Sequence, residues 1–410
     1  MSDGSADDRE PLPRIAAIPE PRSWRNWQAV RTGTLPSQIV EMRLYSDAWF
    51  VAEAYGFGPY SFLNPVASTR RGSMFDLKPG VVLRVGLALR PEPSVPLVTS
   101  DDHYHGGNLF DEVTALASLL LEARLVAGPV DREFGDNGDP LGRPRAHDAS
   151  YVPLLPTTNQ APQIPRLAGQ RDLRHLADLA TFPLLSPAAA TALIKAARLY
   201  QNALWIADSA PETAWLLLVS AVETAANQWD GEVATPAERL AATFPSLVSL
   251  LAKHEREALV PKVARILKGI IGSTGKFVGF LQAFAPGPPD ARPRYGQFDF
   301  APDNRTAAIK QVYKLRSRAL HDGTPFPFPM CHPPDTFDGV AEEIPTGLGA
   351  GALGATWAVA DTPMLLHFFA YLTRGALLSW WRTLVPADAK VDDPPFSDIL
   401  RERGGPGRAV

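Results

Sequence analysis

Residues 309–323 read IKQVYKLRSRALHDG, and this stretch decides how the second half of the chain folds. Wound as a helix with about 3.6 residues per turn, it carries one apolar stripe. The stripe consists of Ile309, Val312, Tyr313, Ala319 and Leu320. Arg316 falls inside the stripe, whereas Lys310, Lys314 and Arg318 fall on the opposite side. Because an isolated buried charge is very costly, Arg316 must be paired or must have a function.

His321 follows Arg316 by five residues, where Asp322, Gly323 and Pro325 end the helix. Histidine titrates near neutral pH and can act as a general acid or base. The planar fork of arginine can stabilise negative charge that builds up on phosphate oxygens. An arginine and a histidine at one helix end are therefore candidate catalytic groups for a phosphodiester.

Residues 316–321, RSRALH, match the Arg-x4–6-His pattern of HEPN domains, and the context at 313–323 resembles the Apea-like branch of that superfamily. The resemblance implies a metal-independent endoribonuclease in which the 2′-hydroxyl of the RNA attacks the adjacent phosphorus. It also implies a 2′,3′-cyclic phosphate product and a site shared across a homodimer or a higher oligomer. The resemblance further suggests that the protein is a bacterial toxin or antiviral nuclease in the cytoplasm, which stays inactive until a trigger acts.

Three further residues are predicted to support Arg316 and His321. Glu223 lies at the margin of the apolar stripe of the helix predicted at 212–227, so it is the predicted partner of Arg316. Tyr313 precedes Arg316 by one turn, and Ser317 follows it, as in Apea-like members. Arg318 and Lys314 are candidate contacts for RNA phosphate, or they are solvated charges.

The same residues also allow a structural interpretation. Arg316 then pairs with a buried carboxylate, and His321 stabilises the negative end of the helix dipole. The chain would in that case be a non-catalytic HEPN module for dimerisation or ligand binding. Arg316 and His321 would keep their positions in both interpretations, but only the first gives them a reaction.

The charge distribution favours a polyanionic partner more than the total charge does. The formal net charge is −4. Residues 256–318 contain twelve Lys or Arg and four Asp or Glu, and the remainder contains 28 and 40. A basic block around the candidate site suits RNA, although ordinary solvated helix faces have the same composition.

The pattern of elements predicts an α+β N-terminal domain followed by an all-α HEPN-like helical bundle, mainly α overall. The predicted parts are a disordered tail at 1–22, an α+β sensing or regulatory domain at 23–150, a linker at 151–170, a HEPN-like helical domain at 171–388 and a flexible tail at 389–410. The best strand pattern is at 81–89.

Local signals predict the helix boundaries. Asn108 caps a helix that Gly128 closes, and the Gly- and Asp-rich residues 129–145 are predicted as loop. Further helices are predicted to begin at Pro187 and Pro211, and at Pro236 with a capping box from Thr235. Asp303 or Asn304 is predicted to cap the helix that carries Arg316, and residues 323–360 are predicted as a Pro/Gly-rich insertion. The last helix is predicted from about 361 to 385.

Other classes of site are disfavoured. His103 and His105 have no third metal ligand nearby, and Cys331 with His332 has no companion pair, so no metal or cofactor is predicted. The glycines at 269–275 have the wrong spacing for a P-loop. Charged residues interrupt the apolar run at 364–384, so no membrane partner is expected. The single cysteine suits a reducing cytosol.

Overall fold

The computed structural model describes residues 20–65, 77–89, 101, 104–135, 140–146, 153–156, 161–229, 236–254, 256–267, 273–347 and 349–389. Residues 1–19 of the predicted tail at 1–22 and residues 390–410 of the predicted tail at 389–410 lie outside the described residues, as do His103, Thr235 and the glycines at 269 and 272.

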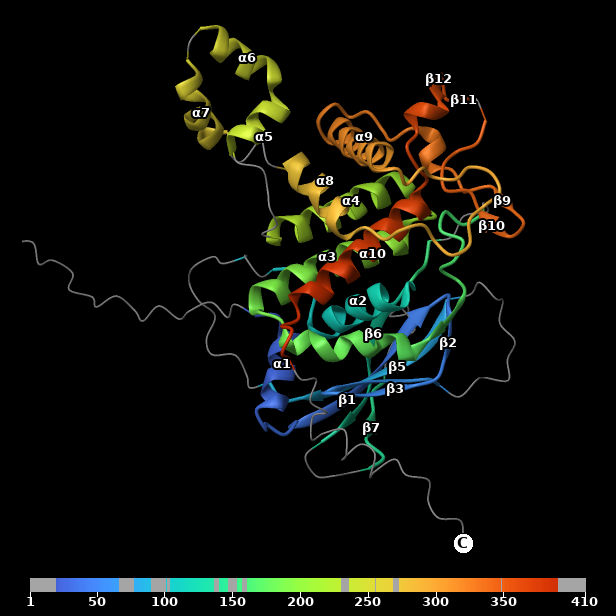
Figure 1. Cartoon of the computed structure of the whole chain (residues 1–410). Coiled ribbons are helices and arrows are strands. Elements are labelled where there is room, and N and C mark those ends of the chain that lie inside the picture. The colour runs from blue at the N-terminus through green and yellow to red at the C-terminus, as the bar shows by residue number, and fades with distance from the viewer. Residues whose placement is uncertain are drawn as a thin grey trace, which may run out of the picture.

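The N-terminal part is built on a six-stranded antiparallel sheet with the order β3-β4-β5-β1-β6-β7 (Figure 1). The strands are β1 (Gln38–Ser46), β3 (Ala54–Phe57), β4 (Tyr60–Leu63), β5 (Lys78–Leu87), β6 (Val126–Phe134) and β7 (Arg143–Pro144). On β1, Val40, Met42 and Leu44 are buried at alternate positions, because successive side chains of a strand point to opposite faces. The short strands β2 (Trp49–Val51) and β8 (Gln170–Asp172) pair in parallel.

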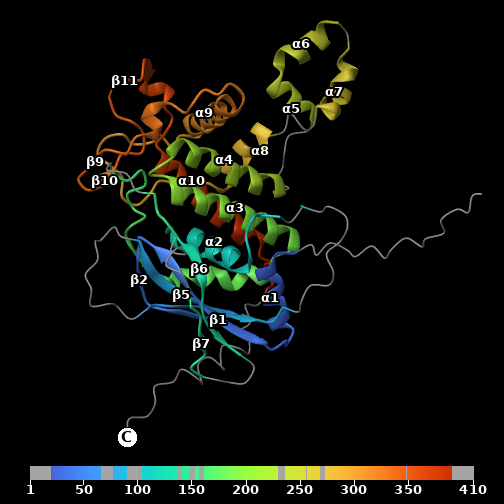
Figure 2. The same cartoon turned by 180° about the vertical axis from the view of Figure 1, so that it is seen from behind.

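Helix α1 precedes the sheet in the chain, α2 lies between β5 and β6, and the other helices follow the sheet. The helices lie mainly over one face of the sheet (Figures 1 and 2). The α-helices are α1 (Arg22–Arg31), α2 (Leu109–Leu121), α3 (Pro187–Ile206), α4 (Pro211–Gln228), α5 (Pro236–Thr243), α6 (Pro245–Lys253), α7 (Val260–Ile266), α8 (Ser273–Phe284), α9 (Pro302–His321) and α10 (Leu366–Leu384). Short 3-10 helices are η2 (Leu173–Leu184), η3 (Glu257–Leu259), η4 (Phe328–Cys331) and η5 (Val359–Asp361). Two hairpins, β9 (Thr336–Phe337) with β10 (Val340–Ala341) and β11 (Gly349–Ala352) with β12 (Ala355–Ala358), precede α10.

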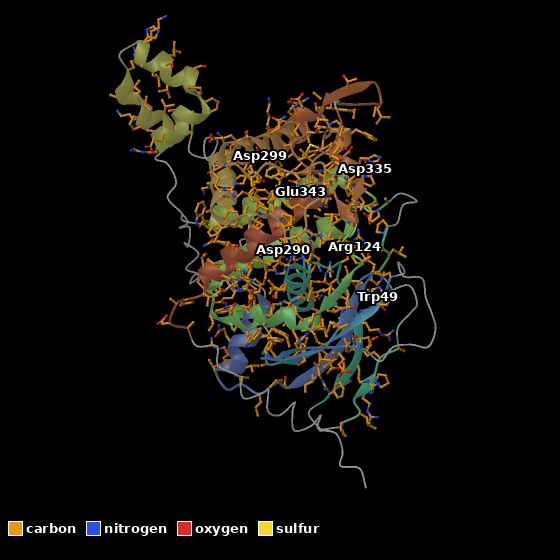
Figure 3. All side chains as sticks on the ribbon, turned by 45° about the vertical axis from the view of Figure 1, so that its right-hand side comes forward. Trp49, Arg124, Asp290, Asp299, Asp335 and Glu343 are labelled. Carbon is orange, nitrogen blue, oxygen red and sulfur yellow. The ribbon has the colours of Figure 1, made fainter. Side chains whose placement is uncertain are left out.

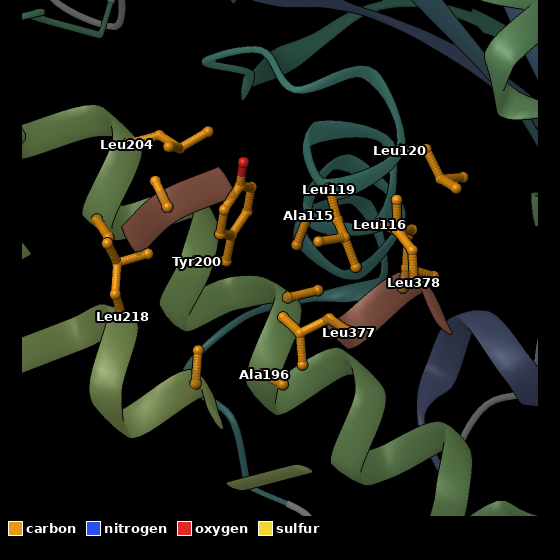
Figure 4. Packing of buried hydrophobic residues seen from close by; sticks show 14 of the residues in the cluster. Ala115, Leu116, Leu119, Leu120, Ala196, Tyr200, Leu204, Leu218, Leu377 and Leu378 are labelled. Atoms are coloured by element: carbon orange, nitrogen blue, oxygen red, sulfur yellow. The ribbon is translucent and has the colours of Figure 1, made fainter. Parts of the chain in front are cut away.

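One apolar core joins the sheet to the helices. It runs without a break from Trp27 on α1 to Trp381 on α10. Figure 4 shows its centre, where leucines of α2 and α10 meet α3 and α4. The labelled side chains are Ala115, Leu116, Leu119, Leu120, Ala196, Tyr200, Leu204, Leu218, Leu377 and Leu378. Full burial of a leucine stabilises a fold by about 1.5–3 kcal/mol, so this cluster is a main source of stability.

The predicted fold class is wrong in one respect: the protein is not mainly α. It is about 49% helical and 17% strand, a mixed α/β structure. The largest error lies at residues 122–145. The helix ends at Leu121, where Glu122 adopts a left-handed conformation, and Gly128 belongs to strand β6. Residues predicted as loop form β6 and β7, because the pairing of β6 with β1 and of β7 with β6 outweighs the turn preference of Gly, Pro and Asp.

Most predicted helix starts are confirmed. Ser186 caps α3 with Pro187 in the first turn, and Pro211 begins α4. Two starts are wrong. The side chains of Asp303 and Asn304 do not cap α9, whose N-cap residue is Ala301, and α10 begins at Leu366 rather than near Asp361. Most of α10 is buried, and no helix in the described ranges is long and apolar enough to cross a membrane.

The helices α5, α6 and α7 stand away from the rest of the protein in both views (Figures 1 and 2). Their own small core contains Leu240 and Ala264 as its buried residues. This protrusion is inserted between α4 and α8, two of the helices that pack near α9.

Candidate functional site

The helix α9 carries the predicted site, and local signals determine where it ends. Pro302 occupies its first turn, where a missing N–H costs nothing. At the other end the N–H groups of Asp322 and Thr324 both donate to the carbonyl of Arg318. Gly323 follows with φ +63°, a left-handed conformation that favours glycine. His321 is therefore held in the last turn of a defined helix.

Arg316 is held by two residues that the sequence predicted. Its Nη2 donates to Oε2 of Glu223 over 2.8 Å, and the Tyr313 hydroxyl donates to Oε1 of Glu223 over 2.9 Å. The side chains of Arg316 and Glu223 are 20% and 18% exposed. The Nε of Arg316 is buried without a hydrogen-bond partner among the described residues. Both carboxylate oxygens are thus occupied, while part of the guanidinium keeps free donor capacity.

Packed helices support this ion pair from behind. Glu223 projects from α4, whose predicted apolar stripe is buried, as expected. The Tyr313 ring packs against Phe277 of α8 at 5.0 Å between centroids, and the guanidinium carbon of Arg316 lies 5.7 Å from the centroid of the same tyrosine ring. Three helices therefore converge on Arg316. Phe277 completes this support, and the sequence analysis did not identify it as part of the site.

His321 lies on a different side of α9 from Arg316. Five residues of α-helix correspond to a rotation of about 140° and a rise of roughly 7.5 Å. Its side chain is exposed to solvent, whereas Arg316 is half-buried. The structure thus brings Glu223 and Tyr313 to Arg316, but it does not bring His321 into this cluster. An exposed histidine remains available to a ligand.

The remaining predicted site residues are divided between the two sides of the helix. Lys314 and Arg318 are exposed, in agreement with their predicted outward position, and Ser317 is half-buried. Leu320 was predicted in the apolar stripe, but it is 51% exposed, and Leu315 is buried instead.

Of the histidine pair near α2, His105 is described, whereas His103 lies outside the described residues. His105 Nε2 lies 2.8 Å from Oε1 of the buried Glu112, whose other oxygen accepts the backbone N–H of Ser23. No group of three or more potential metal ligands occurs among the residues that the structure describes. His105 and Glu112 therefore join α2 to the first turn of α1.

Sequence reasoning did not identify a second buried ionic network. Arg124 Nη1 donates to Asp47 over 2.6 Å, and its Nη2 donates to Asp208. Its Nε donates to the carbonyl of Leu204 over 2.8 Å. Figure 3 shows Arg124 between the sheet and the helices above it. A single arginine after an apolar helix has no distinctive pattern, so no signal in the sequence pointed to this network.

Comparisons with protein-family models, curated protein sequences and solved structures found no match for this chain.

Proposed function

We propose that this protein is a metal-independent endoribonuclease of the HEPN type, in which Arg316 and His321 act on one phosphodiester of RNA. One observation carries the proposal. Arg316 is half-buried and oriented by Glu223, and an exposed histidine follows it at the end of the same helix. Phosphodiester cleavage requires a preorganised cation and a group that can transfer a proton, and arginine and histidine are side chains of these two kinds.

The chemistry needs two proton transfers and one displacement. A base removes the proton of the 2′-hydroxyl, and the 2′-oxygen forms a bond to the adjacent phosphorus. The bond from phosphorus to the 5′-oxygen breaks, and this oxygen leaves with a proton. His321 serves the proton transfer, while Arg316 stabilises the charge on the non-bridging oxygens. The products are a 2′,3′-cyclic phosphate and a 5′-hydroxyl.

The separation of the two side chains around α9 favours a homodimer. Because they leave the helix about 140° apart, one copy does not point both groups at the same atom. In the dimer that the HEPN resemblance implies, two copies of the motif face one cleft, and each copy completes the site of the other. A cytoplasmic toxin or antiviral role in a bacterium is part of this proposal.

The test is RNA cleavage by purified protein in the presence of EDTA. Wild type is compared with His321→Ala and Arg316→Ala after matching their thermal stability. The expected result is cleavage by wild type, cyclic phosphate ends, and loss of both in each variant. Inert wild type together with unfolding of both variants would overturn the proposal. That outcome would favour a non-catalytic HEPN module, in which the bond from Arg316 to Glu223 is purely structural.

A further inference from the structure

The exposed face of α9 carries a row of three cations. Lys310, Lys314 and Arg318, which we call the cation row, are four residues apart and are all exposed. Each step advances about 6 Å along the axis and turns by about 40°. His321 follows Arg318 by three residues, which rotates it back to within about 20° of Lys310. The row and His321 therefore lie on one side of the helix, away from Arg316.

Ordinary helix stability does not explain this row. Cations near a helix C-terminus are favoured by the dipole, which accounts for Arg318 and His321 in the last turn. Lys310 and Lys314 precede that turn, and like charges four residues apart destabilise a helix. Asp322 is the only acidic residue three or four positions from any member of the row. Within the described part of the chain, no ion pair neutralises any of the three.

We propose that the cation row holds three successive phosphates of the RNA strand and delivers the next phosphodiester to His321. The inference rests on the ribonuclease function proposed above and adds Lys310 and a length requirement to it. A spacing of about 6 Å between cations is similar to the spacing of neighbouring phosphates along a single strand. A basic track of this kind follows the backbone and does not depend on the base sequence.

The length requirement follows from the geometry. Three phosphates on one side of the cleaved bond must reach the row for full binding. Each nucleotide that is removed from that side of the substrate removes one contact between a phosphate and the cation row. Substrates that are shortened on the other side keep all three contacts, so shortening the two ends has unequal effects on KM.

The first experiment measures kcat and KM on a single-stranded RNA of about twelve nucleotides at several salt concentrations. The variants are Lys310→Gln, Lys314→Gln and the double variant, and Arg31→Gln on α1 is the control because Arg31 is also exposed. Each lost phosphate contact is expected to reduce the slope of log(kcat/KM) against log[salt] by about 0.7. The row variants should raise KM several-fold and leave kcat near wild type, whereas Arg31→Gln should change neither.

The second experiment separates this inference from the ribonuclease function. Binding of the same RNA with 2′-O-methyl groups, which cannot be cleaved, is followed by fluorescence anisotropy. The row variants are expected to bind this RNA more weakly than wild type, with a smaller slope of log affinity against log[salt]. That result supports RNA binding by the cation row even if wild type cleaves no RNA. Cleavage and binding that are unchanged in the row variants would overturn the row and leave the ribonuclease proposal standing. Wild type that fails to bind the RNA would also overturn the row.

Discussion

Glu223 is the residue on which the orientation of Arg316 depends. Its two carboxylate oxygens accept from Arg316 and Tyr313, so Glu223→Gln removes the ion pair at nearly constant volume. The carboxamide keeps one acceptor oxygen for Arg316 but carries no negative charge to hold the guanidinium. We expect the free energy of unfolding to fall by about 1–3 kcal/mol and the kcat of RNA cleavage to fall at least about tenfold. Urea unfolding and cleavage kinetics measure the two effects.

Tyr313→Phe is the matched control for Glu223→Gln. It removes one hydrogen bond from the same carboxylate and keeps the ion pair with Arg316. The expected loss of stability is about 1 kcal/mol, with a smaller effect on kcat. If Glu223→Gln had the stability and activity of wild type, the orientation of Arg316 would not depend on this carboxylate.

His367 gives the stability of the protein a pH dependence that can be assigned to one residue. Burial lowers the pKa of His367 to about 4 from its usual 6.5, while its Nε2–H donates to the carbonyl of Glu342. The unfolded chain binds this proton below about pH 6.5 and the folded chain does so only below about pH 4, so stability falls as pH decreases through that window. The shift corresponds to roughly 3 kcal/mol.

The measurement for His367 is urea unfolding at pH 7, 6, 5 and 4. In His367→Gln the loss of stability between pH 6.5 and 4 should be smaller than in wild type by about that amount. Equal losses in both proteins would mean that other groups account for the acid sensitivity.

Among the helices, α2 shows how much an N-cap residue contributes to the stability of the protein. The side chain of Asn108 accepts the N–H groups of Phe110 and Asp111, and Asp111 accepts the N–H of Asn108 in return. Asn108→Ala should lower the free energy of unfolding by about 1 kcal/mol. Asn304→Ala is the control, because Asn304 contacts Asp299 and does not cap α9. Chemical denaturation of both variants tests whether capping occurs at Asn108 and not at Asn304.

At the level of helices and strands, the helices were easier to predict from the sequence than the strands. Ser186 and Pro187 begin α3 through contacts within four residues, and such contacts can be read from the sequence. Strand β6 is half-buried along its whole length and contains Gly128, Pro129 and Asp131, so it has no alternating pattern. Its position depends on β1, about ninety residues away in the sequence, which local rules do not detect.

For the molecule as a whole, Cys331 is a built-in probe of unfolding because it is the only cysteine. Burial raises the pKa of its thiol to about 12, so little thiolate is present at pH 8. Alkylation by iodoacetamide at pH 8 should be slow in the folded protein and should follow the unfolding transition that tryptophan fluorescence reports in urea. Mass spectrometry measures the adduct. Alkylation well before that transition would reveal local opening at η4.

The described residues of the predicted linker at 151–170 pack against the rest of the molecule. Ile164 and Leu167 belong to the common core, and the Nε2 of Gln163 donates to the carbonyl of Cys331 over 2.8 Å. Arg124 adds a buried ionic connection from the end of α2 to Asp47 and Asp208. The described residues of this segment thus form part of the contact between sheet and helices.

The sequence by itself determined the helix that carries Arg316 and His321 and its end at Gly323. These features depend on periodicity and on residues within a few turns, where chain connectivity limits the possible geometries. Only the tertiary structure decided the order of the sheet, the continuity of the core and the exposure of Leu320. Those features depend on contacts between distant segments, whose free energy is absent from any local pattern.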